Sequence, residues 1–295
     1  MKKILISSIL CLSSLAHAHD LWVAAPNTQP ANQILRADLA YGDNFPAGGS
    51  IPEARAKIFK PLELLDSKGK LVPLKLTGDN YQYSSTNKIK SGTYHILATY
   101  KPTFWLKDAN GKWFQDKNLS HIPDASHCEQ NQMFAKRLLV VGNEYDEITA
   151  TVPVGQLLEI VPLANPHEVK IGGVLPLQVW YQGKPLAGAT VTATSDTYLA
   201  QDPDGKIAHR EIQAYSGKTD SEGRTNFIPL LEGEWKIRVQ HKADFEDKSV
   251  CQHHALYATY MMTIGTQRAA PAPAAQKHDH HHDHHHDHHH HDHKH

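Results

Sequence analysis

Turn-forming clusters of glycine, asparagine and aspartate recur along the chain and separate short segments of alternating polarity. Three of these clusters are Gly42-Asp43-Asn44, Thr77-Gly78-Asp79-Asn80 and Asn110-Gly111. Alternation with a period of two is typical of half-buried strands, and such frequent turns disfavour long helices. The 17 prolines and 18 glycines fit the same interpretation. The pattern predicts an all-β chain with two Ig-like or transthyretin-like antiparallel β-sandwich domains.

We expect the strands at the most regular of these segments. They are residues 34–40, 56–65, 92–100 and 138–140 in the first half, and 175–181, 189–194, 225–228, 235–241 and 259–264 in the second half. One segment, Glu129 to Lys136, is predicted to form a short helix.

Changes in composition indicate the domain boundaries. The segment Val161-Pro162-Leu163-Ala164-Asn165-Pro166 interrupts the alternation. We therefore expect an N-terminal sandwich at 19–163 and a C-terminal sandwich at 164–267. Residues 268–277 are rich in proline and alanine and are predicted to be a linker. Residues 278–295 form a histidine- and aspartate-rich tail.

The first 18 residues have the three parts of a secretory signal peptide. Lys2 and Lys3 supply the positive charge, residues 4–15 are apolar, and Ala16-His17-Ala18 is a small-x-small cleavage site. The apolar segment is too short to span a membrane. We therefore expect cleavage after Ala18 and export through the inner membrane into the periplasm.

The tail holds thirteen of the 23 histidines, interrupted by aspartates about every four residues. Its predicted metal ligands are His278, His280, His281, His282, His284, His285, His286, His288, His289, His290, His291, His293 and His295. Neutral imidazole is a common ligand of zinc, nickel and copper, and carboxylates add oxygen donors. The regular aspartates argue against a purification tag, and acidic or serine-rich sequence would suit a merely solvating tail better. We expect the tail to bind several divalent transition-metal ions.

Histidines outside the tail are further candidate ligands. Cleavage after Ala18 would make His19 the first residue, whose free amine and imidazole can chelate one ion together. His241 ends a predicted strand and would lie at a sandwich rim, where an ion can reach it. A solvated polar surface is the commoner explanation for the other candidates, which are His121, His127, His253 and His254.

Two cysteines remain after the predicted cleavage, Cys128 and Cys251. In an oxidising compartment, a pair of cysteines favours one disulfide. Because each cysteine has a histidine nearby, metal binding by these thiols is the weaker alternative. The disulfide would bring His127 toward His253 and His254.

The remaining features argue against two other classes of function. A formal net charge of -1 gives no reason to propose nucleic acid as a partner. The sequence contains no glycine-rich phosphate loop, no Gly-x-Ser-x-Gly elbow and no His-Glu-x-x-His helix. We therefore expect a protein that is not an enzyme and does not bind nucleic acid.

Several short segments occur in an order that is similar to a known family. They are His19-Asp20-Leu21-Trp22-Val23, residues 161–166, residues 183–189, Thr219-Asp220, Glu222-Gly223-Arg224, Gly233-Glu234-Trp235 and His241. Over residues 17–265 the chain resembles the DUF4198 family. The resemblance implies a periplasmic component of nickel/cobalt uptake systems, with His19 and His241 as metal-associated positions. It also implies Ni²⁺ or Co²⁺ as the ion and inner-membrane nickel/cobalt transporter components as partners. The histidine-rich tail leaves Zn²⁺ and Cu²⁺ as alternatives.

The predicted function is therefore capture of Ni²⁺ or Co²⁺ and its supply to an inner-membrane importer. One alternative is buffering of periplasmic zinc or copper without a transporter. Another is a copper monooxygenase, because a β-sandwich whose mature chain begins with histidine also describes enzymes that hold copper in a histidine brace. A brace requires a second histidine close to His19.

Overall fold

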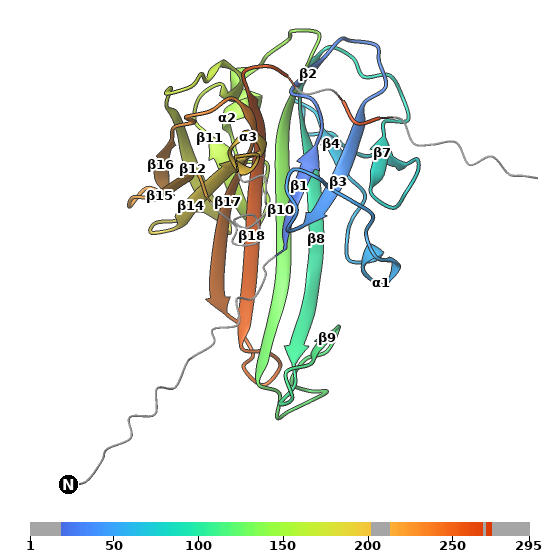
Figure 1. The fold of residues 1–295 in the computed structure, drawn as a ribbon, viewed down its shortest axis with the longest axis vertical. Coiled ribbons are helices and arrows are strands. Elements are labelled where there is room, and N and C mark those ends of the chain that lie inside the picture. Colours follow the sequence, from blue (N-terminus) through green and yellow to red (C-terminus); the bar gives the residue numbers. More distant parts are fainter. Residues whose placement is uncertain (1–18, 202–212, 268–269, 273–295) are drawn as a thin grey trace, which may run out of the picture.

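Four long strands form the middle of one large sheet in the computed structural model, which describes residues 19–201, 213–267 and 270–272. The four are β8 (Gly92–Lys107), β10 (His127–Val141), β17 (Gly233–Asp244) and β18 (His253–Ile264). β18 pairs with β17 on one side and with β10 on the other, and β8 follows β10. Figure 1 shows these strands side by side along the longest axis of the molecule.

Shorter strands complete this ten-stranded sheet. Beyond β17 lie β14 (Thr190–Ser195) and β15 (Tyr215–Lys218), and beyond β8 lie β4 (Glu63–Leu65) and β5 (Leu71–Pro73). Two more strands pair at the sides, namely β2 (Thr28–Gln29) with β10 and β9 (Trp113–Gln115) with β8.

Two smaller antiparallel sheets cover the two faces of the large sheet. The first contains β1 (Asp20–Ala24), β3 (Arg36–Gly42), β7 (Gln82–Ser84) and β6 (Lys75–Leu76). The second contains β11 (Leu158–Pro162), β12 (Leu175–Tyr181), β13 (Lys184–Pro185) and β16 (Arg224–Phe227). Successive strand residues point to opposite faces, and β18 divides accordingly. Its residues Ala255 and Tyr257 pack with the first small sheet, whereas Leu256 and Ala258 pack with the second.

Helices are few and short in the described chain. They are α1 (Glu53–Ala56), α2 (Glu147–Thr151), α3 (Asp196–Leu199) and the 3-10 turn η1 (Pro166–Glu168). The predicted class is confirmed, since the chain folds into antiparallel sheets stacked as a β-sandwich.

The large sheet runs through both halves of the chain. β10 comes from the first half and β18 from the second, and they pair in parallel from Glu129↔His253 to Arg137↔Met261. The division into domains at residues 163 and 164 stays a prediction, and the shared sheet passes across it. The predicted signal peptide at 1–18, most of the predicted linker at 268–277 and the tail at 278–295 lie outside the described residues.

Two predicted elements were wrong. Residues Glu129–Lys136 form part of strand β10 and not a helix. This segment pairs with β8 on one side and β18 on the other, so its backbone groups are satisfied by neighbouring strands whatever its local preference. The strand predicted at 56–65 is shorter, because Ala56 ends helix α1 and the strand begins at Glu63.

The predicted disulfide is confirmed. Cys128, at the start of β10, is bonded to Cys251, which lies two residues before β18. Both cysteines are fully buried. The bond therefore fastens the parallel pair β10–β18 at the end where both strands begin. It closes a loop with a sequence separation of 123 residues.

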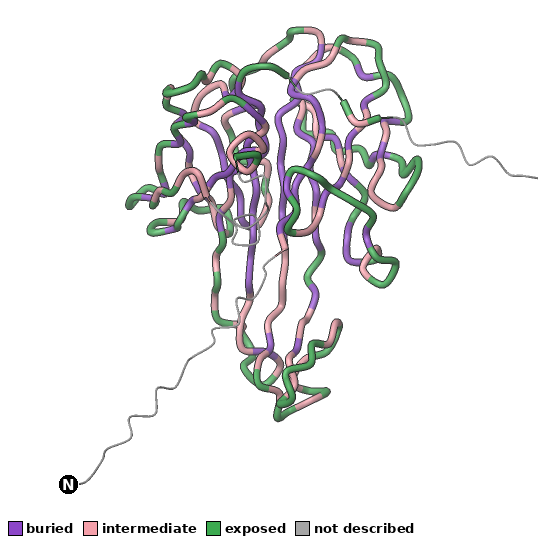
Figure 2. Tube along the Cα trace, viewed as in Figure 1, coloured by how far each residue is buried: buried purple, intermediate pink, exposed green. Residues whose placement is uncertain are grey.

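Burial is uneven along the long strands. Figure 2 shows that buried residues dominate where the small sheets cover them, and that exposure increases toward the tip near β9. Between these two regions lie Trp105 on β8 and Glu129 on β10, which are neither fully buried nor fully exposed. The partly covered stretch of the sheet is where side chains can meet a ligand.

Candidate functional site

The segment that follows the predicted cleavage site is fixed to the large sheet by a buried ion cluster. The Asp20 carboxylate accepts hydrogen bonds from Lys236 Nζ at 2.5 Å and from Arg238 Nε at 2.6 Å. Burial opposes ionisation of Asp20, but the two cations outweigh it and hold the pKa of this carboxyl below its usual value. Lys236 also lies 5.2 Å from the ring of the buried Trp22. Asp20 and Trp22 therefore hold the chain in place directly after His19.

The His19 imidazole has a polar partner at each ring nitrogen. Nδ1 lies 3.1 Å from the Tyr41 hydroxyl, and Nε2 lies 3.0 Å from Asp43 Oδ1. The β1–β3 register pairs Asp20 with Gly42, which places His19 beside Asp43. The His19 side chain is 31% exposed, so an ion can reach it.

Imidazole is a transition-metal ligand, and removal of residues 1–18 would add the free amine of His19 as a second donor. The amine chelates together with Nδ1 of its own residue, so binding would exchange the Tyr41 contact for a metal bond. Asp43 contacts Nε2, on the other side of the ring, where it orients the imidazole and does not share this ion. Within the described residues, no group of three or more His, Cys, Asp or Glu side chains is arranged to hold a metal. The residues present therefore fit an ion at His19 only with this additional amine.

A cavity of about 200 Å³ lies next to His19. Five aromatic residues from strands β3, β8, β9 and β18 line it: Tyr41, Tyr100, Trp105, Trp113 and Tyr257. The Trp105 indole donates a hydrogen bond to the Tyr100 hydroxyl at 2.7 Å, which fixes both rings. The cavity is therefore a rigid aromatic enclosure.

Three polar side chains enter this aromatic cavity. Arg55 of α1 lies with its guanidinium carbon 5.4 Å from the Trp105 ring centre. Glu129 and Asn131 line the cavity from β10. Asn131 Oδ1 is buried and has no hydrogen-bond partner in the described part of the chain. A buried acceptor of this kind is unfavourable unless a ligand or water supplies a donor.

Glu129 is held in its ionised form. Burial opposes ionisation, but a hydrogen bond from His127 at 3.0 Å, together with Asn131 and Lys242, outweighs it and lowers the pKa of Glu129. The His127 ring lies 5.9 Å from that of His253. The structure thus brings His127 and His253 together beside Glu129, as we expected from the disulfide.

The other candidate histidines lie elsewhere. His241 is 4.4 Å from the Tyr181 ring, on the face covered by the second small sheet. His254 is its neighbour on that face, and burial followed by the charge of His241 lowers the pKa of His254. His19 lies on the opposite face, next to Tyr257. The structure therefore does not bring His19 and His241 together. His121 lies in an exposed loop, where its Nδ1 is 3.0 Å from Asn118 Oδ1.

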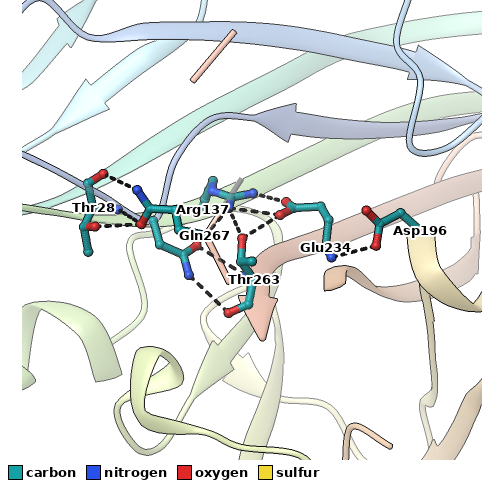
Figure 3. A network of polar contacts seen from close by, with 7 residues as sticks. Thr28, Arg137, Asp196, Glu234, Thr263 and Gln267 are labelled. Carbon is teal, nitrogen blue, oxygen red and sulfur yellow. Dashed lines mark hydrogen bonds and ion pairs between the residues drawn. The ribbon is translucent and has the colours of Figure 1, made fainter. Parts of the chain in front are cut away.

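The predicted tail ligands, from His278 to His295, lie outside the described residues. The last described residues before them make defined contacts with the N-terminal half of the chain. Gln267 forms hydrogen bonds with Thr28, including one of 2.6 Å from the Thr28 hydroxyl. Arg36 Nε donates to the Pro271 carbonyl at 3.0 Å. Figure 3 shows Gln267 beside a buried network in which Arg137 pairs with Glu234.

That network continues through neighbouring polar groups. Arg137 donates to Thr263 Oγ1 at 2.9 Å and to Asn27 Oδ1 at 2.8 Å. Thr263 in turn donates to Glu234 at 2.6 Å. These contacts attach the end of β18 to the segment after β1.

The described residues include no helix with the length and hydrophobicity needed to cross a membrane. The fold and the cavity define an all-β sandwich protein whose predicted mature N-terminal residue, His19, lies beside an aromatic pocket.

The chain belongs to the family described as a domain of unknown function, DUF4198, whose family model matches residues 16–243. No curated protein matches this chain. Among solved structures, the D00-D0 domain of intimin aligns with 83% of this chain and with its own full length, at 10% identity and a TM-score of 0.20.

Four residues of this region were not among the predicted site residues. Asp20 belongs to the His-Asp-x-Trp segment, and its position next to the buried Trp22 is the signal that marks it. Glu129 and Asn131 were hidden by the helix predicted there, since a helix does not place them on one face as a strand does. Arg55 lies in the four-residue helix α1, which the sequence analysis did not predict.

Proposed function

We propose that this protein is exported to the periplasm, captures a divalent transition-metal ion and supplies it to an inner-membrane importer, with Ni²⁺ or Co²⁺ as the ion. The observation that carries the proposal is the tail of thirteen histidines and four aspartates at 278–295. No described feature assigns a reaction to the chain, and the proposed protein is a binding protein and not an enzyme.

The length of the tail supports cooperation with a body site at His19. Pro271, in the last described part of the chain, accepts a hydrogen bond from Arg36, and Asp43 lies seven positions after Arg36, about 23 Å at the rise of a strand. Residues 273–295 can span at most about 80 Å when fully extended. The tail is therefore long enough to bring its ligands to His19. Transfer to an importer requires release, so the tail should bind more weakly than the site at His19.

Metal titration of the mature chain tests this proposal. Three proteins are compared by equilibrium dialysis against Ni²⁺: residues 19–295, residues 19–272, and residues 19–272 with His19→Gln. We expect several ions on the first, one on the second and none on the third. The matched control is His121→Gln, which removes an exposed histidine far from the proposed site and should leave the one ion bound. If residues 19–295 bind no ion, the proposal is wrong.

Deletion of the gene separates capture from buffering. Loss of a supply protein lowers cellular nickel or cobalt accumulation at limiting concentrations. Loss of a zinc or copper buffer leaves nickel accumulation unchanged and alters tolerance of excess zinc or copper. The copper-brace alternative needs a second histidine, and the residues that line the cavity beside His19 include no other histidine.

A further inference from the structure

The cavity beside His19 carries side chains that metal binding does not use. Its walls are mainly aromatic, and Arg55, Glu129 and Asn131 enter it as polar groups. An apolar cavity with a few convergent polar groups is the usual form of a small-molecule site. Its volume of about 200 Å³ equals roughly seven water molecules at about 30 Å³ each, which suits one small organic molecule.

We propose that this cavity binds a small aminocarboxylate, a molecule of the α-amino acid class with one carboxylate and one ammonium group. The proposal does not depend on the metal-binding function, because none of the three polar groups is a ligand in that function.

Arg55 would hold the carboxylate. Its guanidinium lies over the Trp105 ring at 5.4 Å, shares a hydrogen bond with the Tyr41 hydroxyl, and forms no ion pair with a carboxylate of the described residues. Stacking on an indole fixes the plane of the guanidinium, and the N–H groups that Tyr41 does not use stay available for a carboxylate. A planar guanidinium matches a carboxylate with two parallel hydrogen bonds, which favours this ligand over a neutral one.

Asn131 and Glu129 would hold the ammonium group. The Asn131 amide hydrogen-bonds with Glu129, which orients the amide and leaves the buried Oδ1 without a partner in the described chain. Only a donor satisfies Oδ1, and an ammonium group supplies donors to Oδ1 and to the ionised Glu129 together.

The two charges lie on either side of one indole. Glu129 is the cross-strand partner of Trp105, and Arg55 stacks on the same Trp105 ring. A ligand that reaches both must carry a negative and a positive group close together. A sugar would leave Arg55 without a charged partner, and a bare cation would not use Arg55.

Titration of metal-free protein tests this proposal. Residues 19–295 in excess EDTA are titrated with each common L-amino acid up to about 10 mM, followed by calorimetry and by the fluorescence of the tryptophans. We expect at least one apolar or aromatic amino acid to bind, and its decarboxylated amine to bind about tenfold more weakly or less.

Two variants and a matched control assign the contacts. Arg55→Gln should weaken amino acid binding about tenfold or more and leave the affinity for the amine unchanged. Asn131→Leu should weaken both the amino acid and the amine. Lys57→Gln removes a nearby exposed cation, which pairs with Asp116 outside the cavity, and should change nothing.

Three results would overturn the proposal: no amino acid binds, the amine binds as tightly as the amino acid, or Arg55→Gln binds the amino acid like the parent protein. Nickel titration of the same proteins remains a separate measurement, so failure of the aminocarboxylate site and failure of the metal site are distinguishable.

Discussion

Asp20 and Lys236 lie 216 residues apart in the chain, and their side chains form an ion pair of 2.5 Å in the buried interface between β1 and the large sheet. This pair connects the predicted mature N-terminus to a strand near the other end of the chain. The ion pair gives a physical reason for an aspartate directly after His19. It fixes the backbone at Asp20 and thereby the position of the neighbouring imidazole.

Replacement of Asp20 should be strongly destabilising. Asp20→Asn removes the carboxylate that neutralises the buried Lys236, and breaking a buried pair in this way costs about 3–5 kcal/mol. Denaturant unfolding of the mature protein measures this loss. The matched control is Glu222→Gln, which breaks the exposed pair with Arg224 and should cost less than about 1 kcal/mol. Equal costs for the two variants would contradict the role assigned to Asp20.

Stability should fall as the pH decreases below about 6.5, because the buried His95 and the partly buried His167 are held in their neutral form. Burial, followed by the charge of Lys136, holds the pKa of His95 well below its usual range, and burial with Arg137 lowers the pKa of His167 to about 4. Because the histidine pKa is lower in the folded protein, the unfolded chain binds more protons in this pH range. The folded protein therefore keeps its full stability above about pH 6.5, the histidine pKa of the unfolded chain, and loses stability as the pH falls toward the folded pKa.

The slope of unfolding free energy against pH identifies these groups. Each such histidine contributes up to about 1.4 kcal/mol per pH unit between its folded and unfolded pKa values. Between about pH 6 and pH 5, His95→Phe should reduce the slope of unfolding free energy against pH by the contribution of one histidine. This reduction is expected whatever the substitution does to stability at neutral pH. His121→Gln, at an exposed position, should leave the slope as it is. An unchanged slope in His95→Phe would show that His95 is not buried neutral.

Loss of the disulfide should lower stability by about 5 kcal/mol in the chain-entropy model, because it closes a loop with a separation of 123 residues. The double variant Cys128→Ala, Cys251→Ala is compared with the parent protein by denaturant unfolding. A reductant should destabilise the parent and leave the double variant unaffected. A reductant effect of equal size in both proteins would point to a different cause.

Metal binding by the tail should weaken as the medium becomes acidic. Near pH 5, roughly one imidazole in thirty of ordinary pKa stays neutral, and metal must displace the protons of the others. Calorimetric titration with Ni²⁺ should give at least a tenfold lower affinity near pH 5 than near pH 7.5 for residues 19–295. Residues 19–272 provide the baseline for the body. Equal affinities at both pH values would argue against imidazole as the ligand.

The sequence was sufficient for the features that depend on local pattern. Alternation and turn clusters predicted the all-β class, and the count of two cysteines predicted the pairing of Cys128 with Cys251. The segment His19-Asp20-Leu21-Trp22 was recognised as a family feature, although the reason for its aspartate was not visible. The aspartate pairs with Lys236 of β17, more than two hundred residues away in the chain.

Features that depend on strand pairing could not be predicted. The parallel pairing of β10 with β18 provides backbone hydrogen bonds for a segment that the sequence predicted to be a helix. As a strand, this segment places Glu129 and Asn131 on one face of the sheet. It also separates His19 from His241, since the position of each residue along a strand determines which face of the sheet it occupies. No local pattern reports the register between strands that lie a hundred residues apart.

The parallel pairing of β18 with β10 also has a consequence for the order in which the chain folds. Until residues 253–264 have been synthesised, β10 and β17 each present an open edge with unpaired backbone groups. Open edges of this length invite pairing with other chains. A chain cut at residue 243, where the family match ends, would keep both edges and lose the partner of Cys128. Such a fragment should aggregate, because β18 is the strand that covers both edges in the folded chain.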